Sequence, residues 1–239
     1  MDPKVILDKK EFLVVVKPSG WITNEADTTK GQSVLQTWIK ENLDFPIAGS
    51  KEFRSGIVHR LDKETSGVLI IAKTKHAFED LQGQFKNRTV QKNYIALVHG
   101  KLFPEKGSVD APVGRLPWNR ERFGVLPGGR EAQTDYSVEE YYKKGADVFS
   151  LVNVFPKTGR THQIRIHMKH LGHPLVADTF YAGRKTARND RRWCLRMFLH
   201  AKGISFSDPA SGETVKVESL LPDDLASVID SLEIASERG

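Results

Sequence analysis

Two apolar runs constrain the fold of this chain more than any other feature. FLVVV at residues 12–16 and VLIIA at residues 68–72 are rich in β-branched side chains and contain no polar residue. Pro18 follows the first run and Gly67 precedes the second, so a residue that interrupts regular structure lies beside each. Runs of this length and composition predict short, buried β-strands.

Helical spacing occurs between other predicted strands. Apolar residues recur every three or four positions in residues 33–43 and 75–88, and residues 161–171 predict a short helix that ends at Gly172. A last helix is predicted to begin near Pro222, because proline fits the first turn of a helix.

Strands account for most of the remaining pattern. Further strands are predicted at residues 90–100, 132–142, 147–156, 203–206 and 214–218. Residues 101–130 are rich in proline and glycine and predict long turns or a hairpin. Dominant strands with scattered helices predict an α+β fold. No break in composition marks an independent domain, so a single domain over residues 1–239 is expected.

The charge of the chain is unevenly distributed. The net charge is +6, but residues 207–239 carry eight acidic and two basic residues, which leaves +12 on the preceding 206 residues. A chain this basic over most of its length favours a polyanionic partner.

Two segments concentrate arginine, in part beside aromatic residues. Residues 115–130 interleave arginines with Trp118 and Phe123, and residues 184–196 form a second basic segment, predicted to be a loop. Guanidinium groups bind phosphates through paired hydrogen bonds, and aromatic rings stack on unpaired bases. A solvated surface explains one such cluster, whereas two in one basic chain favour nucleic-acid binding.

Several other functions are disfavoured. The histidines of residues 161–174 lack an HExxH pattern and paired cysteines, which favours ordinary hydrogen-bonded histidines over a metal site. Phosphate-loop spacing is absent, and Cys194, the single cysteine, has no evident base and is interpreted as a buried thiol. Neither a cofactor nor a metal is predicted. The first residues lack a secretory signal and no apolar run reaches membrane-span length, so a cytoplasmic protein without a membrane partner is expected.

The stretch HRLDKETSG at residues 59–67 places charged residues directly before a predicted buried strand. Arg60 lies two residues from Asp62, and Arg165 lies beside the apolar stripe of the helix predicted at residues 161–171. A guanidinium beside a buried carboxylate favours the ionised form that a nucleophile or base requires. A carboxylate also caps turns. The residues alone therefore leave a structural and a catalytic role for Asp62 equally open.

Several segments resemble, in order, those of the RluA-type pseudouridine synthases. HRLDKETSG is similar to the signature around the catalytic aspartate of that family, and FLVVVKPSGW at residues 12–21 resembles its opening strand and Lys-Pro turn. Three further segments with a resemblance are QKNYIALVHG (91–100), FPKTGRTHQIRIHMKHLGHPLVAD (155–178) and FLHAKGISFSDPASGE (198–213). The resemblance spans residues 5 to 225, approximately, and implies one catalytic domain without the small S4-like RNA-binding domain of many relatives. It also implies a long, bent, mainly antiparallel mixed sheet, flanked by helices and loops, with a central catalytic cleft.

The resemblance implies an enzyme that isomerises uridine in RNA to pseudouridine. Asp62 then is the essential carboxylate, which either attacks the ribose at C1′ or promotes proton loss at C2′. Tyr94 stacks on the uracil and assists a later proton removal, the alternative being a core aromatic residue of a strand. Arg165 pairs with Asp62. Arg60 fills the space of the extruded base, the alternative being a phosphate contact or a surface ion pair.

The expected partner is RNA, with ribosomal RNA favoured over transfer RNA, and a monomer is expected. The predicted RNA-binding residues are His59, Arg60, Arg115, Arg120, Arg122, Arg160, Arg188, Arg191 and Arg192. Thr65 and Ser66 are expected, with Gly67, to shape the turn that supports Asp62. An RNA-binding or ribosome-assembly factor without catalysis is disfavoured by the complete catalytic set. A glycoside hydrolase is disfavoured because Asp62 has no evident partner acid.

Two departures from the family pattern are expected to matter. The family often has Gly-Asp where this chain has Ala177 and Asp178, a change expected to alter the local turn without touching the three catalytic roles. The basic segment 184–196 is longer and more basic than the usual connection, which bears on the choice of RNA rather than on the reaction.

Overall fold

The computed structural model describes residues 1–117 and 119–235, and for Arg120 and Glu121 it describes the backbone alone. The chain folds into two compact units. The first comprises residues 1–92 and 201–219, and the second comprises residues 93–200 together with the chain from residue 220 onward. The expectation of one catalytic domain over the whole chain stays a prediction.

The first unit is built on antiparallel strands. They are β1 (Lys4–Asp8), β2 (Phe12–Lys17), β3 (Ser66–Ala72), β10 (Leu199–Ser207, in this unit from Ala201) and β11 (Thr214–Glu218). β1 pairs with β2, β2 with β3, and β10 with β11. β3 is buried along its whole length and β2 along most of it, which confirms the two strands predicted from the apolar runs. β1 alternates between exposed and half-buried residues and was not predicted.

Two helices accompany these strands. α1 (Leu35–Asn42) and α2 (Lys75–Lys86) confirm the predicted helical segments, and short 3-10 turns lie at Asp27–Thr29 and Arg54–Gly56. The Thr74 hydroxyl caps α2 by accepting a hydrogen bond from the Ala77 amide at 3.2 Å. α2 packs on β3 through its buried apolar face.

The second unit contains a sheet in the order β4-β9-β8-β12. Its strands are β4 (Gln91–His99), β9 (Asp147–Pro156), β8 (Gln133–Lys144) and β12 (Glu233–Ile234), with β5 (Lys106–Asp110) also paired to β8. Each of these pairings is antiparallel. The strand pair predicted at 132–142 and 147–156 is confirmed. The proline- and glycine-rich segment contains β5 and the separate hairpin of β6 (Val113–Leu116) and β7 (Asn119–Val125).

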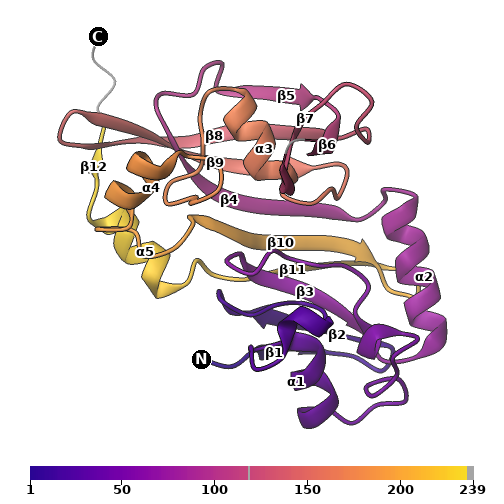
Figure 1. Cartoon of the computed structure of the whole chain (residues 1–239). Helices are drawn as coiled ribbons and strands as arrows, with labels where there is room; N and C mark the ends of the chain where they lie inside the picture. Colours follow the sequence, from indigo (N-terminus) through magenta and orange to yellow (C-terminus); the bar gives the residue numbers. More distant parts are fainter. Residues whose placement is uncertain (118, 236–239) are drawn as a thin grey trace. The chain divides into compact units, whose positions relative to one another are not determined.

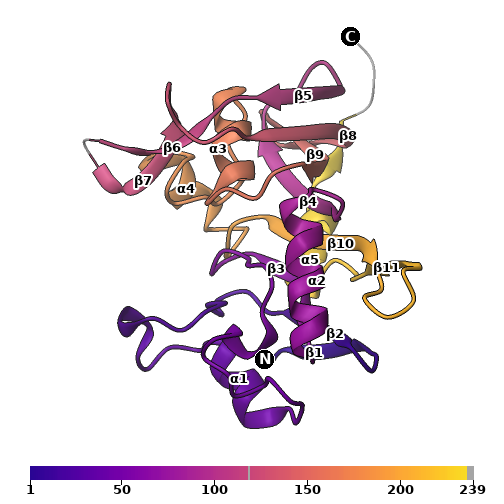
Figure 2. The ribbon, with the colours of Figure 1, turned by 90° about the vertical axis from the view of Figure 1, so that its right-hand side faces the viewer.

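Three helices complete the second unit. α3 (Gln163–His170) lies against β8 and β9 (Figure 1), with Ile164 and Met168 in the core as predicted. In Figure 2 the β6–β7 hairpin extends beyond α3, on the side away from β8 and β9. α5 (Asp223–Asp230) begins directly after Pro222, as predicted.

The prediction of a loop over the basic segment 184–196 was wrong. Residues expected as a loop form α4 (Arg184–Asp190), followed by turns. Ala187 and Asp190 of this helix are buried. Packing of these two side chains gives the charged segment an inner face, which its sequence pattern did not reveal.

The chain has the predicted α+β fold, with a mainly antiparallel, mixed sheet arrangement. Among the described residues, no helix has both the length and the apolar character needed to cross a bilayer.

Candidate active site

Asp62 lies in a tight turn immediately before β3. The Thr65 amide donates to the Asp62 carbonyl oxygen at 3.1 Å and closes the turn. Leu61, the preceding residue, is buried, and both of its backbone polar groups bond to the hydroxyl of Thr23. Thr23 Oγ1 donates to the Leu61 carbonyl at 2.8 Å and accepts from its amide at 3.2 Å. The backbone that carries Asp62 is therefore held on both sides.

The Lys-Pro turn that follows β2 supports the same loop. Lys17 is fully buried, and its ammonium donates to the carbonyl oxygens of Pro18 (2.9 Å), Trp21 (2.8 Å) and Lys63 (3.3 Å). The Lys63 carbonyl also accepts a hydrogen bond from the Gly20 amide at 2.8 Å. A buried ammonium is costly unless such acceptors surround it. The turn after Asp62 is thus fastened to the end of β2.

Gly67 follows this turn and approaches another strand closely. Its φ is +125°, and a Cβ at this position would lie 2.3 Å from the carbonyl oxygen of Ala201. Only glycine permits both the backbone conformation and the contact. Thr65 and Ser66 are buried beside it. These positions agree with the expectation that residues 65–67 shape the turn.

His59 stands at the start of the motif with its ring packed inside the first unit. The Ile70 amide of β3 donates to His59 Nε2 at 2.9 Å, and the ring stacks on Phe85 of α2 at 4.6 Å between centroids. Burial, with a smaller effect of the positive charge of Lys92, lowers the pKa of His59 to about 3. The imidazole is therefore neutral at physiological pH. This geometry favours support of the motif by His59 over the predicted RNA contact, whereas Arg60 is exposed.

Arg165, on α3, is held by a buried carboxylate. Its Nε and Nη2 donate to the two oxygens of Asp178 at 2.8 and 2.9 Å, and the two residues are 5% and 0% exposed. The amides of Phe180 and Tyr181 donate to Asp178 Oδ1 at 2.9 and 3.1 Å. The guanidinium also lies 5.4 Å from the Phe180 ring centroid and 4.9 Å from that of Tyr181. Fork-to-fork pairing fixes the guanidinium plane.

Asp178 is a buried partner of Arg165 that the sequence interpretation did not include. The departure from the family pattern lies at Ala177, whereas Asp178 fits the pattern and pairs with the guanidinium of Arg165. The expectation that the departure touches none of the three catalytic roles stays a prediction. The one available signal was an acidic residue immediately after the apolar run Leu175–Ala177, since a carboxylate placed there requires a partner.

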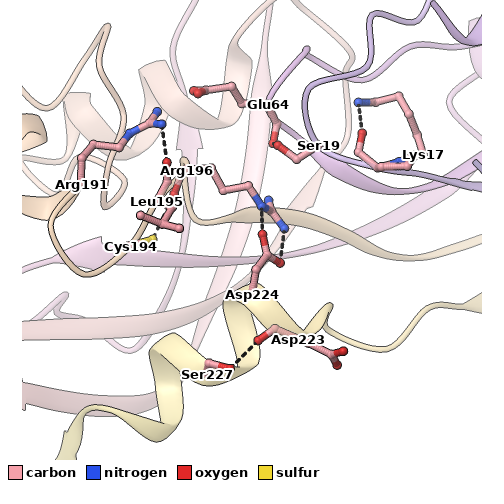
Figure 3. A network of polar contacts seen from close by, with 11 residues as sticks. Lys17, Ser19, Glu64, Arg191, Cys194, Leu195, Arg196, Asp223, Asp224 and Ser227 are labelled. Atoms are coloured by element: carbon pink, nitrogen blue, oxygen red, sulfur yellow. Dashed lines mark hydrogen bonds and ion pairs between the residues drawn. The ribbon is translucent and has the colours of Figure 1, made fainter. Parts of the chain in front are cut away.

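The backbone before Asp178 is held by the end of α4. Ala177 has a φ of +61°, a left-handed conformation that favours the glycine common in the family. Its amide donates to Asp190 Oδ2 at 2.9 Å, and its carbonyl accepts from Arg191 Nε at 3.1 Å. Arg191 also donates to the Leu195 carbonyl at 2.6 Å (Figure 3). Arg191, predicted to bind RNA, therefore has a structural role as well.

Tyr94 lies in β4 opposite Val154 of β9. Its side chain is half-buried and packs against the core cluster of the second unit. Asp62 belongs to the first unit, and Tyr94 and Arg165 belong to the second. The predicted pairing of Asp62 with Arg165 and the stacking of Tyr94 on the target base stay predictions.

The other predicted RNA-binding residues differ in exposure. Arg115 and Arg122 are exposed on the β6–β7 hairpin, and Arg188 and Arg192 are exposed in and directly after α4. Arg160 is half-buried and donates to the Glu131 carbonyl at 2.9 Å. The side chain of Arg120 lies outside the described residues, as does Trp118. These residues stay predicted RNA contacts.

His167 and Cys194, both buried in the second unit, have structural contacts. The two ring nitrogens of His167 lie 2.9 Å from Thr134 Oγ1 and 2.9 Å from the Ala111 carbonyl oxygen, so each nitrogen has a hydrogen-bond partner within the protein. Cys194 is fully buried, its Sγ donates to the Arg196 carbonyl at 3.0 Å, and burial raises its pKa to about 11. The interpretation of Cys194 as a buried thiol is confirmed. Arg196 itself forms an ion pair with Asp224 of α5 (Figure 3).

Comparison with known proteins identifies the family. Residues 11–170 match the family described as RNA pseudouridylate synthase. The chain is 37% identical to the RNA pseudouridine synthase YlyB of Bacillus subtilis and 35% identical to the ribosomal large subunit pseudouridine synthase D of Nitrosomonas europaea. The matches cover 97% and 96% of this chain and 73% and 65% of those relatives.

A solved structure agrees with the sequence comparison. The human RNA pseudouridylate synthase domain containing 1 superposes with a TM-score of 0.75 at 28% identity, covering 98% of this chain and 89% of that one. The human domain containing 4 protein, at 22% identity and a TM-score of 0.72, has the same fold. The chain thus belongs to the RNA pseudouridylate synthase family, a family of isomerases, and the RluA-type resemblance of its motifs is confirmed.

Proposed function

We propose that this protein converts specific uridines of ribosomal RNA to pseudouridine, with Asp62 as the essential carboxylate. The observation that carries the proposal is the rigid support of Asp62, whose neighbours on both sides are fastened to Thr23 and to the Lys17 turn. An essential group held by buried backbone contacts needs little reorganisation when the substrate binds. Relatives named ribosomal large subunit pseudouridine synthase D support ribosomal RNA as the substrate.

The reaction exchanges one bond to the ribose for another. The bond between N1 of uracil and C1′ breaks and the bond between C5 and C1′ forms. The C5 proton is released to solvent and N1 takes up a proton, so the product is an isomer and the reaction consumes no redox equivalent. Asp62 acts either as a nucleophile at C1′ or in proton loss at C2′. Tyr94 stacks on the uracil and assists removal of the C5 proton. Arg165, oriented by Asp178, stabilises the carboxylate of Asp62.

Binding requires that the target base leave its stack. Arg60 is exposed two residues before Asp62, and its planar guanidinium fills the space of the extruded nucleotide. The exposed arginines of the β6–β7 hairpin and of α4 bind phosphates of the same RNA.

The experiment measures tritium release from RNA that contains [5-³H]uridine. Asp62→Asn is expected to abolish release while RNA binding stays within about twofold, because the substitution removes the reacting carboxylate and keeps the side-chain size. Asp27→Asn, which neutralises an exposed acid of the same unit, serves as the matched control and should retain full release. Release by Asp62→Asn at the wild-type rate would refute the proposal. Binding without release by the wild-type protein would point to an RNA-binding factor instead.

A further inference from the structure

Phe180 is exposed although its backbone is firmly held. The residue is 41% exposed and belongs to the small group of large apolar residues that are exposed in the described part of the chain. Its amide donates to the buried Asp178 carboxylate at 2.9 Å. The Asp178 contact therefore holds the backbone of an exposed aromatic residue in place.

Cationic groups surround this ring. The Cζ of Arg122, on the β6–β7 hairpin, lies 6.0 Å from the ring centroid, and the Cζ of Arg165 lies 5.4 Å from it. The rings of His162 and Tyr181 lie 5.9 and 6.3 Å away. Arg165 is already paired with Asp178, whereas Arg122 is exposed. The ring therefore lies between one engaged guanidinium and one that is accessible to an anion.

The hairpin beside Phe180 extends the same pattern. Phe123 of β7 packs edge-to-face on His162 at 6.0 Å, and Arg115 of β6 lies 5.1 Å from the Phe123 centroid. These contacts join the hairpin to the N-terminal end of α3, next to which it lies in Figure 2. The exposed Phe180 and the half-buried Phe123 thus both contact His162, and each lies beside an exposed arginine.

The positive charge and the aromatic rings of this surface indicate which kind of ligand it binds. An apolar protein partner would have to bury exposed guanidinium groups without counter-charges, which is costly. An unpaired nucleotide satisfies both components, because its base stacks on the ring while its phosphate accepts hydrogen bonds from arginine. A nucleotide inside a duplex is stacked on both faces and therefore presents no free face to the ring.

We infer that Phe180, with Arg122 and Arg115, forms a stacking site for an unpaired nucleotide that neighbours the target uridine. The inference rests on the proposed function, because Arg165 contacts both this ring and, in the proposed reaction, Asp62. The site gives the enzyme a requirement for at least one unstacked nucleotide beside the target. It thereby restricts the substrate to loops, bulges or junctions of folded RNA.

The test compares ring-removing with ring-preserving substitutions. Phe180→Leu keeps an apolar side chain without a stacking face, and Phe180→Trp keeps the face. Binding is measured by fluorescence anisotropy with a mixed-sequence single-stranded decaribonucleotide and with the same sequence in a blunt duplex. Phe180→Leu should weaken binding of the single strand about tenfold, which is the effect of one lost base stack, and leave duplex binding unchanged. Phe180→Trp should bind both RNAs as the wild type does.

Two further variants separate stacking from charge. Phe103→Leu removes another exposed ring of the second unit and should bind both RNAs as the wild type does. Arg122→Gln should reduce the slope of log affinity against log salt by about 0.7, whereas Phe180→Leu should leave that slope unchanged. Equal binding of the single strand by Phe180→Leu and the wild type would overturn the inference, as would equal losses for single strand and duplex.

The outcome is distinguishable from failure of the proposed function. All binding measurements are repeated in the Asp62→Asn background, in which no turnover is expected. Loss of single-strand binding by Phe180→Leu in that background supports the stacking site whether or not the wild-type protein releases tritium. Absence of single-strand binding by the wild-type protein overturns the stacking site even where tritium release from folded RNA is intact.

Discussion

The two units hold their candidate catalytic residues by different physical means. In the first unit the Asp62 turn is fixed by hydrogen bonds among backbone groups, the Thr23 hydroxyl and the ammonium of Lys17. In the second unit Arg165 is fixed by a buried ion pair with Asp178. The first arrangement distributes its support over several residues, whereas the second centres on a buried carboxylate that accepts two hydrogen bonds from Arg165. Substitutions should therefore damage the second unit more than the first.

The largest effect is expected for Asp178→Asn. This substitution removes the buried carboxylate charge that accepts two hydrogen bonds from Arg165 and should lower the free energy of unfolding by about 3–5 kcal/mol, as measured by urea denaturation. Tritium release should fall along with it, because Arg165 loses its orientation. Asp224→Asn, which removes the half-exposed partner of Arg196, is the matched control and should cost about 1 kcal/mol. Both pairs lie in the second unit, and similar losses for the two variants would contradict the special weight given to the buried Asp178 carboxylate.

A smaller loss is expected for Thr23→Val in the first unit. Valine keeps the shape of threonine but leaves the buried amide and carbonyl of Leu61 without the hydroxyl that bonds to both. The expected loss is about 2–3 kcal/mol in urea denaturation. Thr28→Val, at an exposed position of the same unit, should cost less than about 0.5 kcal/mol. A loss for Thr23→Val as large as that for Asp178→Asn would show that the Asp62 turn also depends on one contact.

The smallest effect is the pH dependence that His59 imposes on the first unit. The folded-state pKa of His59 is lowered to about 3 from an unfolded value of 6.5, so the unfolded state binds more protons between these values. Stability is complete above pH 6.5 and falls as the pH decreases towards 3. The expected loss between pH 7 and pH 5 is about 2 kcal/mol.

Substitution of His59 isolates this contribution. His59→Gln keeps an acceptor for the Ile70 amide and should flatten the decrease of stability between pH 7 and pH 5. His76→Gln, which alters an exposed histidine of α2, should retain the wild-type pH dependence. If the decrease of stability between pH 7 and pH 5 were the same in His59→Gln as in the wild type, the pKa of His59 would not differ between the folded and unfolded states.

The predictability of the elements follows the range of their determining contacts. β2 and β3 were predictable because a continuous apolar run indicates a buried strand. α2 was predictable because its apolar spacing lies within the helix and its cap, Thr74, directly precedes it. α4 was not predictable, because its buried face consists of Ala187 and Asp190. Asp190 accepts a hydrogen bond from the amide of Ala177, which lies thirteen residues earlier in the chain. Charged side chains with no apolar stripe give no periodic signal.

The candidate site divides in the same way. The sequence by itself predicted which residues act, because Asp62, Tyr94 and Arg165 lie in segments that resemble the family motifs. Only the tertiary structure decided that Asp178 orients Arg165, that His59 is a neutral support, and that Phe180 faces solvent between arginines. The physical reason is that motifs record residues adjacent along the chain. Ion pairs, shifted pKa values and the surroundings of an exposed ring depend on residues that are distant in the sequence and that folding brings together.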